Sequence, residues 1–580
     1  MIEGLEMRLM PLSLATEKAK VHALLSQCGL RYDDRLTSYL GVFDADDRLV
    51  AGGGLADASI RCLAVSPQAE GEGLAARIVG RLLSEAAQCG WHNVRLFTKP
   101  EHLRLFTSMG FALIGQADGA IVLESQPQAH VAFEQELRRL PRCGRVGAVV
   151  MHANPFTRGH LFLCEHAAAQ VDTLFVVVVA SDASQFTTAE RLDMARRALA
   201  HLPHVQVVEG GRYAISADVF PTYFLKDLSR ATAEQVSLDL DVFCRIVAPS
   251  LGVAVRYVGS EPTDALTAYY NEAMRQMLPG RGIEVVEVPR TGSPRPISAS
   301  AVRQALADGH TGEALAQVPL TTVPFVLAHA ATQALRQELA TTPKPGLVDD
   351  SDAGAHDDMD KTTMQASIRA LQPWFARAGE AAIGPSLPGG DLLRTIGLQA
   401  EQAMLAATGG INTHRGALYA LGLMTAAVAR AWASDGSLHW DVVRRHVSTM
   451  AASMEPAAGT HGSDVVSRYG VRGARAEALT GYERLFDKWL PWLQTSASPL
   501  RLHRLLLQIV LDIDDTTLYH RGGTAAAAFA RAAAEQALML ADDALPAALE
   551  KLNTDFTRMH ISPGGAADML ALTIFVASLQ

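Results

Sequence analysis

The sequence predicts a multidomain protein in which two α/β domains precede an all-α domain. Up to about Gln128, short strand-like runs such as "LVAGGGLA" (49–56) alternate with helical patterns. From Val146 to about Val318, β-rich runs that are apolar on both faces recur between helices, which is typical of parallel strands in a doubly wound sheet. After "VPLTTVPF" (318–325) the strand signal disappears and Ala/Leu-rich segments follow. We expect domains over residues 1–130, 142–320 and 325–580.

The composition favours small-molecule and protein partners over nucleic acid. The 580 residues include 51 Lys and Arg against 61 Asp and Glu, which gives a formal net charge of -10 at pH 7. Binding to a polyanionic backbone needs a basic surface, and no block of Lys and Arg suggests a basic arm. The hydrophobic content of 49% allows several cores. We therefore expect a soluble protein that binds no nucleic acid.

Cysteine usage and the N-terminal segment indicate the cytoplasm. The six cysteines form no C-x-x-C pair and no dense disulfide framework, which fits a reducing compartment. The stretch "MIEGLEMRLMPLSLATEKAK" (1–20) lacks the basic start and the long apolar middle of a signal peptide. No uninterrupted apolar run is long enough to span a bilayer. We expect a cytoplasmic protein with no membrane partner.

A histidine stands at a predicted helix start in "VVMHANPFTRGHLFL" (149–163). The pattern predicts a strand, a turn that contains Pro155, and a helix that opens near Gly159 and His160. Backbone N–H groups at a helix N-terminus attract anions, and glycine permits close backbone approach. An imidazole can donate to a phosphate oxygen and stabilise the charge that grows on it. These features predict a phosphate site beyond the carboxyl edge of the parallel sheet.

A second strand-to-helix entry follows about 140 residues later in "ISASAVR" (297–303), where Ser298, Ser300 and Arg303 are candidates to hold a leaving pyrophosphate. With the Thr-x-Gly-His tetrad, this motif resembles the nucleotidyltransferase superfamily, whose members bind ATP and break its α,β-phosphate bond. Longer segments are similar to citrate lyase ligase, namely "ANPFTRGH" (153–160), "ADVFPTYFLK" (217–226), "RYVGSEPTDALTAYYNEAM" (256–274) and "VEVPRTGSPRPISASAVR" (286–303).

The resemblance implies that acetate attacks ATP to give acetyl-adenylate and pyrophosphate. The thiol of an acyl-carrier prosthetic group then takes the acetyl group and releases AMP. Such a reaction depends on positioning and charge neutralisation, because a carboxylate is already a nucleophile. This resemblance makes His160, Arg303 and Thr157 the catalytic candidates. Thr157 stands where many members have a second histidine, and a turn residue is an equally good interpretation of it. The implied ATP-binding residues are Asn154, Phe156, Gly159, Ser298, Ser300 and Glu261.

Glu261 lies with Asn271 in the matched segment that precedes the second motif. These two side chains are candidates to orient ribose or substrate. Solvated loop residues are an equally good interpretation.

The N-terminal region carries a glycine-rich turn between a predicted strand and a predicted helix. "LAVSPQAEGEGLAARIVGRLLSEA" (63–86) places Gln68, Gly71 and Gly73 in a Q-x-x-G-x-G pattern, which suits a pyrophosphate. With "LRLFTSMGFALIG" (103–115), it resembles the GNAT acetyltransferase fold, in which this loop grips coenzyme A. Phe106 departs from the family, since many members have a proton-donating tyrosine there. We therefore expect this domain to dock the coenzyme A-like arm of the acyl carrier.

Polar clusters interrupt the helices of the C-terminal region. They are "TTPKPGLVDDSDAGAHDDMD" (341–360), "GGINTHRGALYALGL" (409–423), "DDTTLYHRGG" (514–523) and "ISPGGAADMLA" (561–571). Each combines Gly or Pro with charged groups, as a polyphosphate and its Mg²⁺ would require. From about Leu335 to the end, they resemble triphosphoribosyl-dephospho-coenzyme A synthase.

This family joins the triphosphoribosyl part of ATP to the 2′-hydroxyl of dephospho-coenzyme A and expels adenine. Substitution at an anomeric carbon implies an oxocarbenium-like transition state near carboxylates. Candidate triphosphate and substrate contacts are Lys344, His356, Asn412, His414, Arg415 and Arg521, and candidate metal ligands are Asp357, Asp358, Asp360, Asp514 and Asp515. Asp-rich loops more often cap helices or face solvent.

The two enzymatic regions would serve one pathway, in which one makes the precursor of a carrier prosthetic group and the other acetylates its thiol. The expected partners are acetate, ATP, dephospho-coenzyme A and the acyl-carrier subunit of citrate lyase, and a separate transferase would attach the precursor. Three alternatives are open. The same chemistry serves malonate decarboxylase instead of citrate lyase, the protein is a scaffold that binds the carrier without reacting, or the central domain alone adenylylates a coenzyme precursor.

Overall fold

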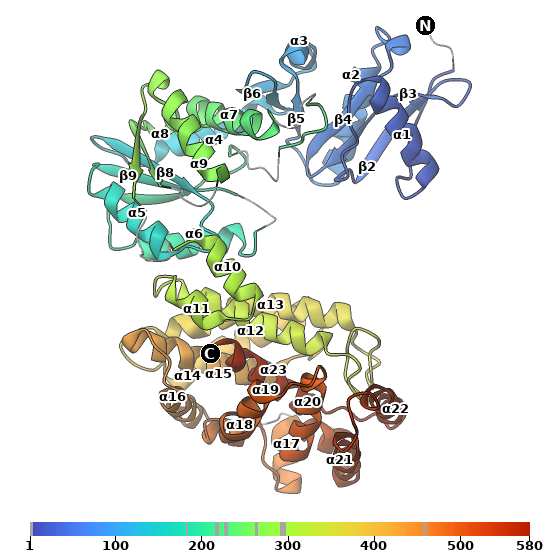
Figure 1. Cartoon of the computed structure of the whole chain (residues 1–580), viewed down its shortest axis with the longest axis vertical. Coiled ribbons are helices and arrows are strands. Elements are labelled where there is room, and N and C mark those ends of the chain that lie inside the picture. The colour runs from blue at the N-terminus through green and yellow to red at the C-terminus, as the bar shows by residue number, and fades with distance from the viewer. Residues whose placement is uncertain are drawn as a thin grey trace. The chain divides into compact units, whose positions relative to one another are not determined.

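The computed structural model describes residues 4–180, 184–214, 220–225, 230–260, 265–289, 297–455, 459 and 461–580 (Figure 1). Internal contacts divide the chain into two compact units. The first comprises Met1–Ala153 and Gly159–Pro296, and the second comprises Asn154–Arg158 and Ile297–Gln580.

The N-terminal part of the first unit is a seven-stranded sheet in the order β1-β2-β3-β4-β5-β7-β6. All neighbouring strands are antiparallel except β4 and β5, whose parallel pairing covers only Ser59↔Arg95 and Ile60↔Leu96. The strands are β1 (Glu6–Leu9), β2 (Ser38–Phe43), β3 (Leu49–Ala56), β4 (Ser59–Val65), β5 (Arg95–Thr98), β6 (Ala112–Gln116) and β7 (Ile121–Glu124).

The helices of this part are α1 (Ala15–Gln27), α2 (Leu74–Gln88), α3 (Leu103–Ser108) and α4 (Pro127–Arg139). Helix α2 is amphipathic, and its apolar face at Leu74, Ile78, Val79, Leu82 and Ala86 is buried. The helix therefore packs one face on the sheet and leaves its N-terminus at the glycine-rich turn.

The second sheet of this unit is entirely parallel and has the order β10-β9-β8-β11-β12. Its strands are β8 (Val146–Met151), β9 (Thr173–Val178), β10 (Val205–Glu209), β11 (Val255–Gly259) and β12 (Glu284–Val288). Every residue of β9 is buried, as expected of a strand covered on both faces. The doubly wound sheet is thus present, and its order reverses at β8, where such folds bind ligands.

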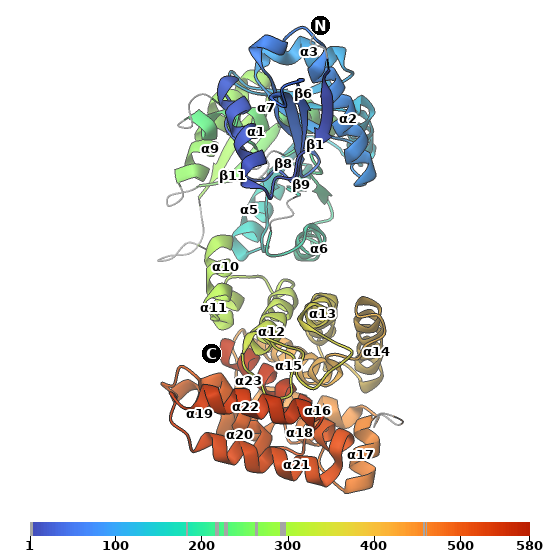
Figure 2. The same ribbon diagram turned by 90° about the vertical axis from the view of Figure 1, so that its right-hand side faces the viewer.

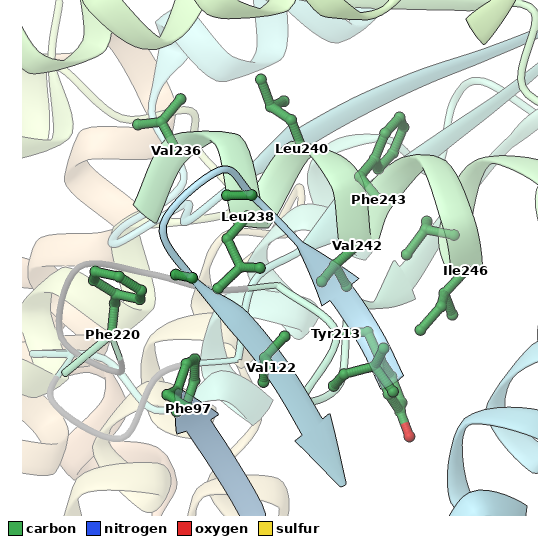
Figure 3. Close-up of a cluster of buried hydrophobic side chains, with 14 of the residues drawn as sticks. Phe97, Val122, Tyr213, Phe220, Val236, Leu238, Leu240, Val242, Phe243 and Ile246 are labelled. Carbon is green, nitrogen blue, oxygen red and sulfur yellow. The ribbon is translucent and has the colours of Figure 1, made fainter. Parts of the chain in front are cut away.

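The helices between these strands are α5 (Arg158–Ala168), α6 (Thr188–Ala198), α7 (Ala231–Val242), α8 (Ala248–Leu251) and α9 (Ala265–Met277). Figure 3 shows how α7 packs against the first sheet, with Leu238 and Val242 beside Val122 of β7. A Cβ atom at Gly115 of β6 would lie 2.4 Å from Val242, so glycine allows this close approach. The backbone N–H of Gly119 also donates to Glu234 of α7 at 2.8 Å.

The segment 220–225 packs against the first sheet as well. The rings of Phe220 and Phe97 meet edge to face with centroids 5.9 Å apart (Figure 3), and Tyr223 Oη donates to the carbonyl of Phe97 at 3.3 Å. Arg31 Nη2 donates to the carbonyl of Thr222 at 2.8 Å. The two sheets therefore share one hydrophobic core.

The second unit is helical, and its described residues contain no strand. Its helices are α10 (Ala299–Ala307), α11 (Thr311–Ala316), α12 (Val323–Ala340), α13 (Lys361–Ala382), α14 (Gly390–Ala407), α15 (Arg415–Asp435), α16 (Trp440–Ser453), α17 (His461–Tyr469), α18 (Ala474–Leu479), α19 (Leu490–Thr495), α20 (Arg501–Asp512), α21 (Thr516–Leu538), α22 (Leu545–Arg558) and α23 (Gly564–Ser578). Figure 2 shows α12, α13 and α14 side by side, and α12 also packs on α15 and α23.

Helix α15 is the one described helix whose length and hydropathy would suffice to cross a membrane, but 67% of its apolar window is buried inside the protein. Most of its residues pack against other helices, as in the core of a helical bundle. Its apolar sequence is therefore explained by the helical core that it forms.

Candidate active sites

The first candidate site begins with the turn 154–158, which belongs to the helical unit together with α10. Arg303 Nη1 donates to the carbonyl oxygen of Asn154 at 2.6 Å, and its Nη2 donates to Ser300 Oγ at 3.1 Å. Ser298 caps α10, because its Oγ accepts from the backbone N–H of Ala301 at 3.0 Å. The structure thus brings together the Asn-Pro turn and the second motif.

The rest of the turn is fixed by burial and by backbone contacts. Phe156 and Thr157 are fully buried and Asn154 is nearly so. Arg158 donates from its backbone N–H to the carbonyl of Gln317 at 2.9 Å and from Nε to the carbonyl of Val318 at 3.1 Å. Burial lowers the pKa of Arg303, but an arginine keeps its charge at neutral pH. A guanidinium is therefore held beside this turn.

His160 lies in the first turn of α5, directly after the strand β8 and the Asn-Pro turn. The predicted strand-turn-helix order is present, and both Gly159 and His160 are half-buried. Glu261 lies outside the described residues. Asn271 is buried and donates from Nδ2 to the carbonyl of Gly259 at 2.9 Å, so it ties α9 to the end of β11.

The glycine-rich turn of the N-terminal sheet precedes α2. Gly71 and Gly73 have φ angles of 84° and 68°, and a Cβ atom at either position would meet no heavy atom within 4 Å. Gln68 is exposed in the short turn before them. Phe106 is buried and meets Phe111 edge to face, with ring centroids 6.1 Å apart, so it fills the core.

A large cavity opens in the helical unit, with a volume of about 1510 Å³. All six residues that the sequence predicts as triphosphate or substrate contacts line it: Lys344, His356, Asn412, His414, Arg415 and Arg521. Of the five predicted metal ligands, Asp358, Asp514 and Asp515 also line it, whereas Asp357 and Asp360 do not. All four polar clusters therefore contribute to one site.

Two of the basic residues in this cavity, Lys344 and Arg521, are held in place by contacts within the protein. Lys344 forms a buried ion pair with Glu338 of α12, and burial raises the pKa of this carboxyl group while Lys344 lowers it. Arg521 donates from Nη1 to the carbonyl of Ala355 at 2.8 Å and from Nη2 to His356 Nδ1 at 2.9 Å. Burial and Arg521 lower the pKa of His356 to about 4, so this ring is neutral at pH 7.

His414 is the most deeply buried imidazole of the cavity. Its Nδ1 lies 2.8 Å from Ser367 Oγ, which in turn lies 2.7 Å from Thr413 Oγ1. Its Nε2 is buried and has no hydrogen-bond partner in the described protein. Burial and the charge of Lys344 lower the pKa of His414 to about 3. The neutral ring therefore keeps one buried nitrogen without a hydrogen-bond partner in the described protein.

The predicted metal ligands occupy different kinds of position. Asp360 caps α13 by accepting from the backbone N–H of Thr363 at 2.8 Å. Asp515 caps α21 and accepts from backbone N–H groups of Thr517 and Ala566, both at 2.9 Å. Asp514 accepts from Arg531 at 2.8 Å.

No three His, Cys, Asp or Glu side chains of the described residues form a metal-binding group. A Mg²⁺ ion that arrives with a triphosphate needs only one or two carboxylates. Asp358 and Asp514 line the cavity and fit that requirement. The metal assignment stays a prediction.

Asp568 is a charged residue of the cavity that was not predicted as a contact, although it stands in the polar cluster 561–571. Asp568 of α23 lines the cavity, and a Cβ atom at Gly416 would lie 1.9 Å from its Oδ2. Burial and the nearby charges of Asp515 and Glu338 raise the pKa of Asp568 well above its ordinary value. A single carboxyl in an apolar helix gives little sequence signal, except that it follows "SPGG" (562–565).

Comparisons with known proteins match the two halves of the chain to two families. The family model described as citrate lyase ligase C-terminal domain matches residues 146–326, and the model described as ATP:dephospho-CoA triphosphoribosyl transferase matches residues 324–580. The citrate (pro-3S)-lyase ligase of Escherichia coli is 35% identical over 53% of this chain and 90% of its own length. The 2-(5''-triphosphoribosyl)-3'-dephosphocoenzyme-A synthase of Klebsiella pneumoniae is 36% identical over 43% of this chain and 89% of its own length.

Solved structures cover smaller parts of the chain. An acyl-CoA N-acyltransferase from Klebsiella pneumoniae is 18% identical and covers 21% of this chain and 96% of its own, with a TM-score of 0.18. A pantothenate synthetase from Thermus thermophilus is 22% identical and covers 35% of this chain and 73% of its own, with a TM-score of 0.22. The two sequence relatives each align over most of their own length and over different parts of this chain. The chain therefore belongs to both the citrate lyase ligase family and the triphosphoribosyl-dephospho-CoA synthase family, and it is a fused enzyme of the ligase and transferase classes.

Proposed function

We propose that the chain is a bifunctional maturation enzyme for citrate lyase. Its first activity acetylates the thiol of the acyl-carrier prosthetic group, with conversion of ATP to AMP and pyrophosphate. Its second activity makes 2′-(5″-triphosphoribosyl)-3′-dephospho-CoA from ATP and dephospho-CoA and releases adenine. Both activities would operate in the cytoplasm.

The cavity of the helical unit is the single observation that carries the synthase activity. Its volume of about 1510 Å³ exceeds the roughly 300–1,000 Å³ of ordinary small-ligand sites, so it has room for two nucleotides. Arg415 and Arg521 supply guanidinium groups that match phosphate oxygens. His414 Nε2 supplies a polar contact that the protein itself does not satisfy. The cavity thus combines a phosphate-binding side with buried polar groups.

The chemistry of the synthase is a substitution at C1′ of the ATP ribose. The bond from C1′ to adenine weakens as positive charge builds on the ribose, and nearby carboxylates stabilise that charge. Asp515 is suited to this role because the backbone amides of α21 and α23 fix its orientation. Mg²⁺ held by Asp358 and Asp514 would neutralise charge on the triphosphate.

The ligase activity would depend on His160 and Arg303. We expect both to contact the ATP phosphates, with Asn154, Phe156, Gly159, Ser298 and Ser300 shaping the nucleotide site and Thr157 beside them. The hydrogen bond from Arg303 to the carbonyl of Asn154, six positions before His160, supports this assignment. These positive and N–H groups would stabilise charge on the α-phosphorus as acetate attacks it. Glu261 remains a candidate for ribose.

The glycine-rich turn at Gly71 and Gly73 would bind the coenzyme A-like arm of the acyl carrier. The open space around both glycines and the start of α2 next to them support this role.

The test is to incubate the purified full chain with ATP and acetate plus the deacetylated carrier, and separately with ATP and dephospho-CoA. We expect AMP in the first reaction and adenine in the second. Adenine without AMP would leave only the synthase, and neither product would favour a carrier-binding scaffold. Repeating the first reaction with the carrier subunit of malonate decarboxylase in place of that of citrate lyase shows which of the two carriers the enzyme acetylates.

A further inference from the structure

Asp568 is a carboxyl of the large cavity that forms no ion pair with a Lys or Arg among the described residues. Most other lining carboxylates form ion pairs with Lys or Arg in the described protein, as Glu338 does with Lys344, Glu401 with Arg415, Glu477 with Arg484 and Asp514 with Arg531. Asp358 is exposed, and it lies 3.8 Å from the neutral ring of His356. Asp515 also lacks a cation, but backbone amides occupy both of its oxygens. Apart from the exposed Asp358, Asp568 is thus the lining carboxyl of the described residues that has neither an ion-pair partner nor backbone amides on both oxygens.

The backbone around Asp568 is shaped to receive its carboxyl group. It accepts a hydrogen bond from the backbone N–H of Ala417 in the first turn of α15. Gly416 leaves the space, because a Cβ atom there would lie 1.9 Å from Asp568 Oδ2. The group is therefore fixed at the start of α15 while it still lines the cavity.

The same helix start carries a buried polar atom without a hydrogen-bond partner in the described protein, in a residue that lines the cavity. His414, the N-cap residue of α15, is 3% exposed, and its Nε2 has no hydrogen-bond partner in the described protein. Thr413 donates to Ser367, which leaves the Ser367 proton for His414 Nδ1. In a neutral ring this arrangement puts the proton on Nε2 and makes it a donor. A buried donor without a partner points to a ligand at this end of the cavity.

We propose that Asp568 is the catalytic acid of the synthase and protonates the departing adenine. This inference rests on the proposed synthase function. The bond between C1′ and N9 of ATP breaks with its electron pair passing to adenine, and the carboxyl proton of Asp568 moves to a ring nitrogen of the base. The 2′-oxygen of dephospho-CoA forms the new bond to C1′ and loses its proton to water. Asp568 regains a proton from water after adenine has left.

The surroundings of Asp568 suit a proton donor. Asp515 and Glu338 face it with negative charge, and Tyr482 lies close enough to act on it electrostatically. Burial and these like charges favour the neutral acid, which can donate a proton at neutral pH. Asp515 remains the fixed carboxylate beside the developing ribose cation. The two carboxyl groups of this cavity thus have different roles, since Asp568 donates a proton to adenine and Asp515 stabilises the positive charge on the ribose.

The test compares ATP with 7-methyl-ATP in the full-length Asp568→Asn variant. The base of 7-methyl-ATP carries a positive charge and departs as a neutral molecule without a proton. We expect adenine release from ATP to fall about 10²- to 10⁴-fold in kcat, with ATP binding by calorimetry retained. Release of 7-methyladenine should stay near the wild-type rate. Asp543→Asn, an exposed carboxyl outside the cavity, is the matched control and should behave as wild type.

Wild-type rates of adenine release in Asp568→Asn would overturn the assignment, and so would equal slowing with ATP and 7-methyl-ATP. If Asp568→Asn does not bind ATP, Gly416→Ala serves instead, because it displaces the carboxyl without removing it. That variant should show the same difference between the two nucleotides, and equal slowing would again overturn the proposal. Failure of the wild-type chain to release adenine from ATP and dephospho-CoA would instead contradict the proposed synthase function itself.

Discussion

The guanidinium of Arg303 donates a hydrogen bond of 2.6 Å to the backbone carbonyl of Asn154, a residue 149 positions earlier in the chain. This contact joins the start of α10 to the turn that leads into His160. Two motifs that are distant in sequence are therefore in contact on the described chain, as expected if both serve one nucleotide.

Replacing Arg303 by lysine should impair the ligase activity and leave the synthase unaffected. A lysine keeps the charge but loses the planar fork that reaches Asn154, Ser300 and a phosphate together. We expect acetate-dependent exchange of pyrophosphate into ATP to fall about 10²- to 10³-fold. Arg139→Lys, on the exposed last turn of α4, is the control. Undiminished exchange in Arg303→Lys would remove this residue from the catalytic set.

Replacing Lys344 by methionine should destabilise the helical unit. The change leaves Glu338 as an uncompensated charge in a buried site, and such losses cost about 3–5 kcal/mol. Urea unfolding followed by tryptophan fluorescence reports this unit, because Trp91 is the one tryptophan of six that lies outside residues 374–492. The double variant Lys344→Met with Glu338→Leu should recover most of the loss. Equal stability of the single variant and the wild type would contradict a buried ion pair.

Much of the architecture could be predicted from the sequence because it depends on local patterns. The continuous apolar runs predict the parallel strands, and β9 is buried along its whole length. The turn with Pro155 and the helix at His160 follow from local residue types. By contrast, the packing of segment 220–225 against Phe97 depends on tertiary contacts that no local pattern reveals.

In the candidate sites, too, the residues within sequence motifs could be predicted, whereas roles that depend on tertiary contacts could not. The six predicted contacts of the synthase all line one cavity, because family motifs preserve chemistry-bearing residues. The sequence could not distinguish helix caps from metal ligands in Asp-rich loops, since both roles use the oxygens of an Asp side chain in a polar loop, and Asp360 and Asp515 cap helices. It also missed Asp568, whose importance depends on its proximity to Gly416 and Asp515.

The stability of the protein should fall as the pH decreases below about 6.5, in part because of His414. In the unfolded chain this imidazole takes up a proton near its ordinary pKa of about 6.5, whereas burial and Lys344 hold the folded pKa at about 3. Its contribution is therefore complete above pH 6.5 and is lost progressively toward pH 3. Between pH 7 and pH 5 this group alone should cost about 2 kcal/mol.

Urea unfolding at the two pH values measures this effect. The His414→Gln variant should lose less stability than the wild type between pH 7 and pH 5, since it lacks the buried imidazole. An identical loss in both proteins would show that His414 does not titrate in this range on unfolding.

Bulky side chains at Gly71 and Gly73 should weaken the use of the acyl carrier and spare adenylate formation. Valine at either position obstructs the open turn before α2, where the carrier arm is expected, and both residues have positive φ angles that disfavour a side chain. We expect a raised KM for the carrier and normal acetate-dependent pyrophosphate exchange. Gly80→Ala, within α2 and in open space, is the control. Loss of exchange in the glycine variants would contradict a docking role.

The central claim is that one chain carries two separate activities. The most direct test measures AMP from ATP, acetate and carrier, and adenine from ATP and dephospho-CoA, in the wild type, His160→Asn and Asp568→Asn. Each variant should lose one product and keep the other, with His160→Asn losing AMP and Asp568→Asn losing adenine. Loss of both products in each variant, or absence of both in the wild type, would contradict the account.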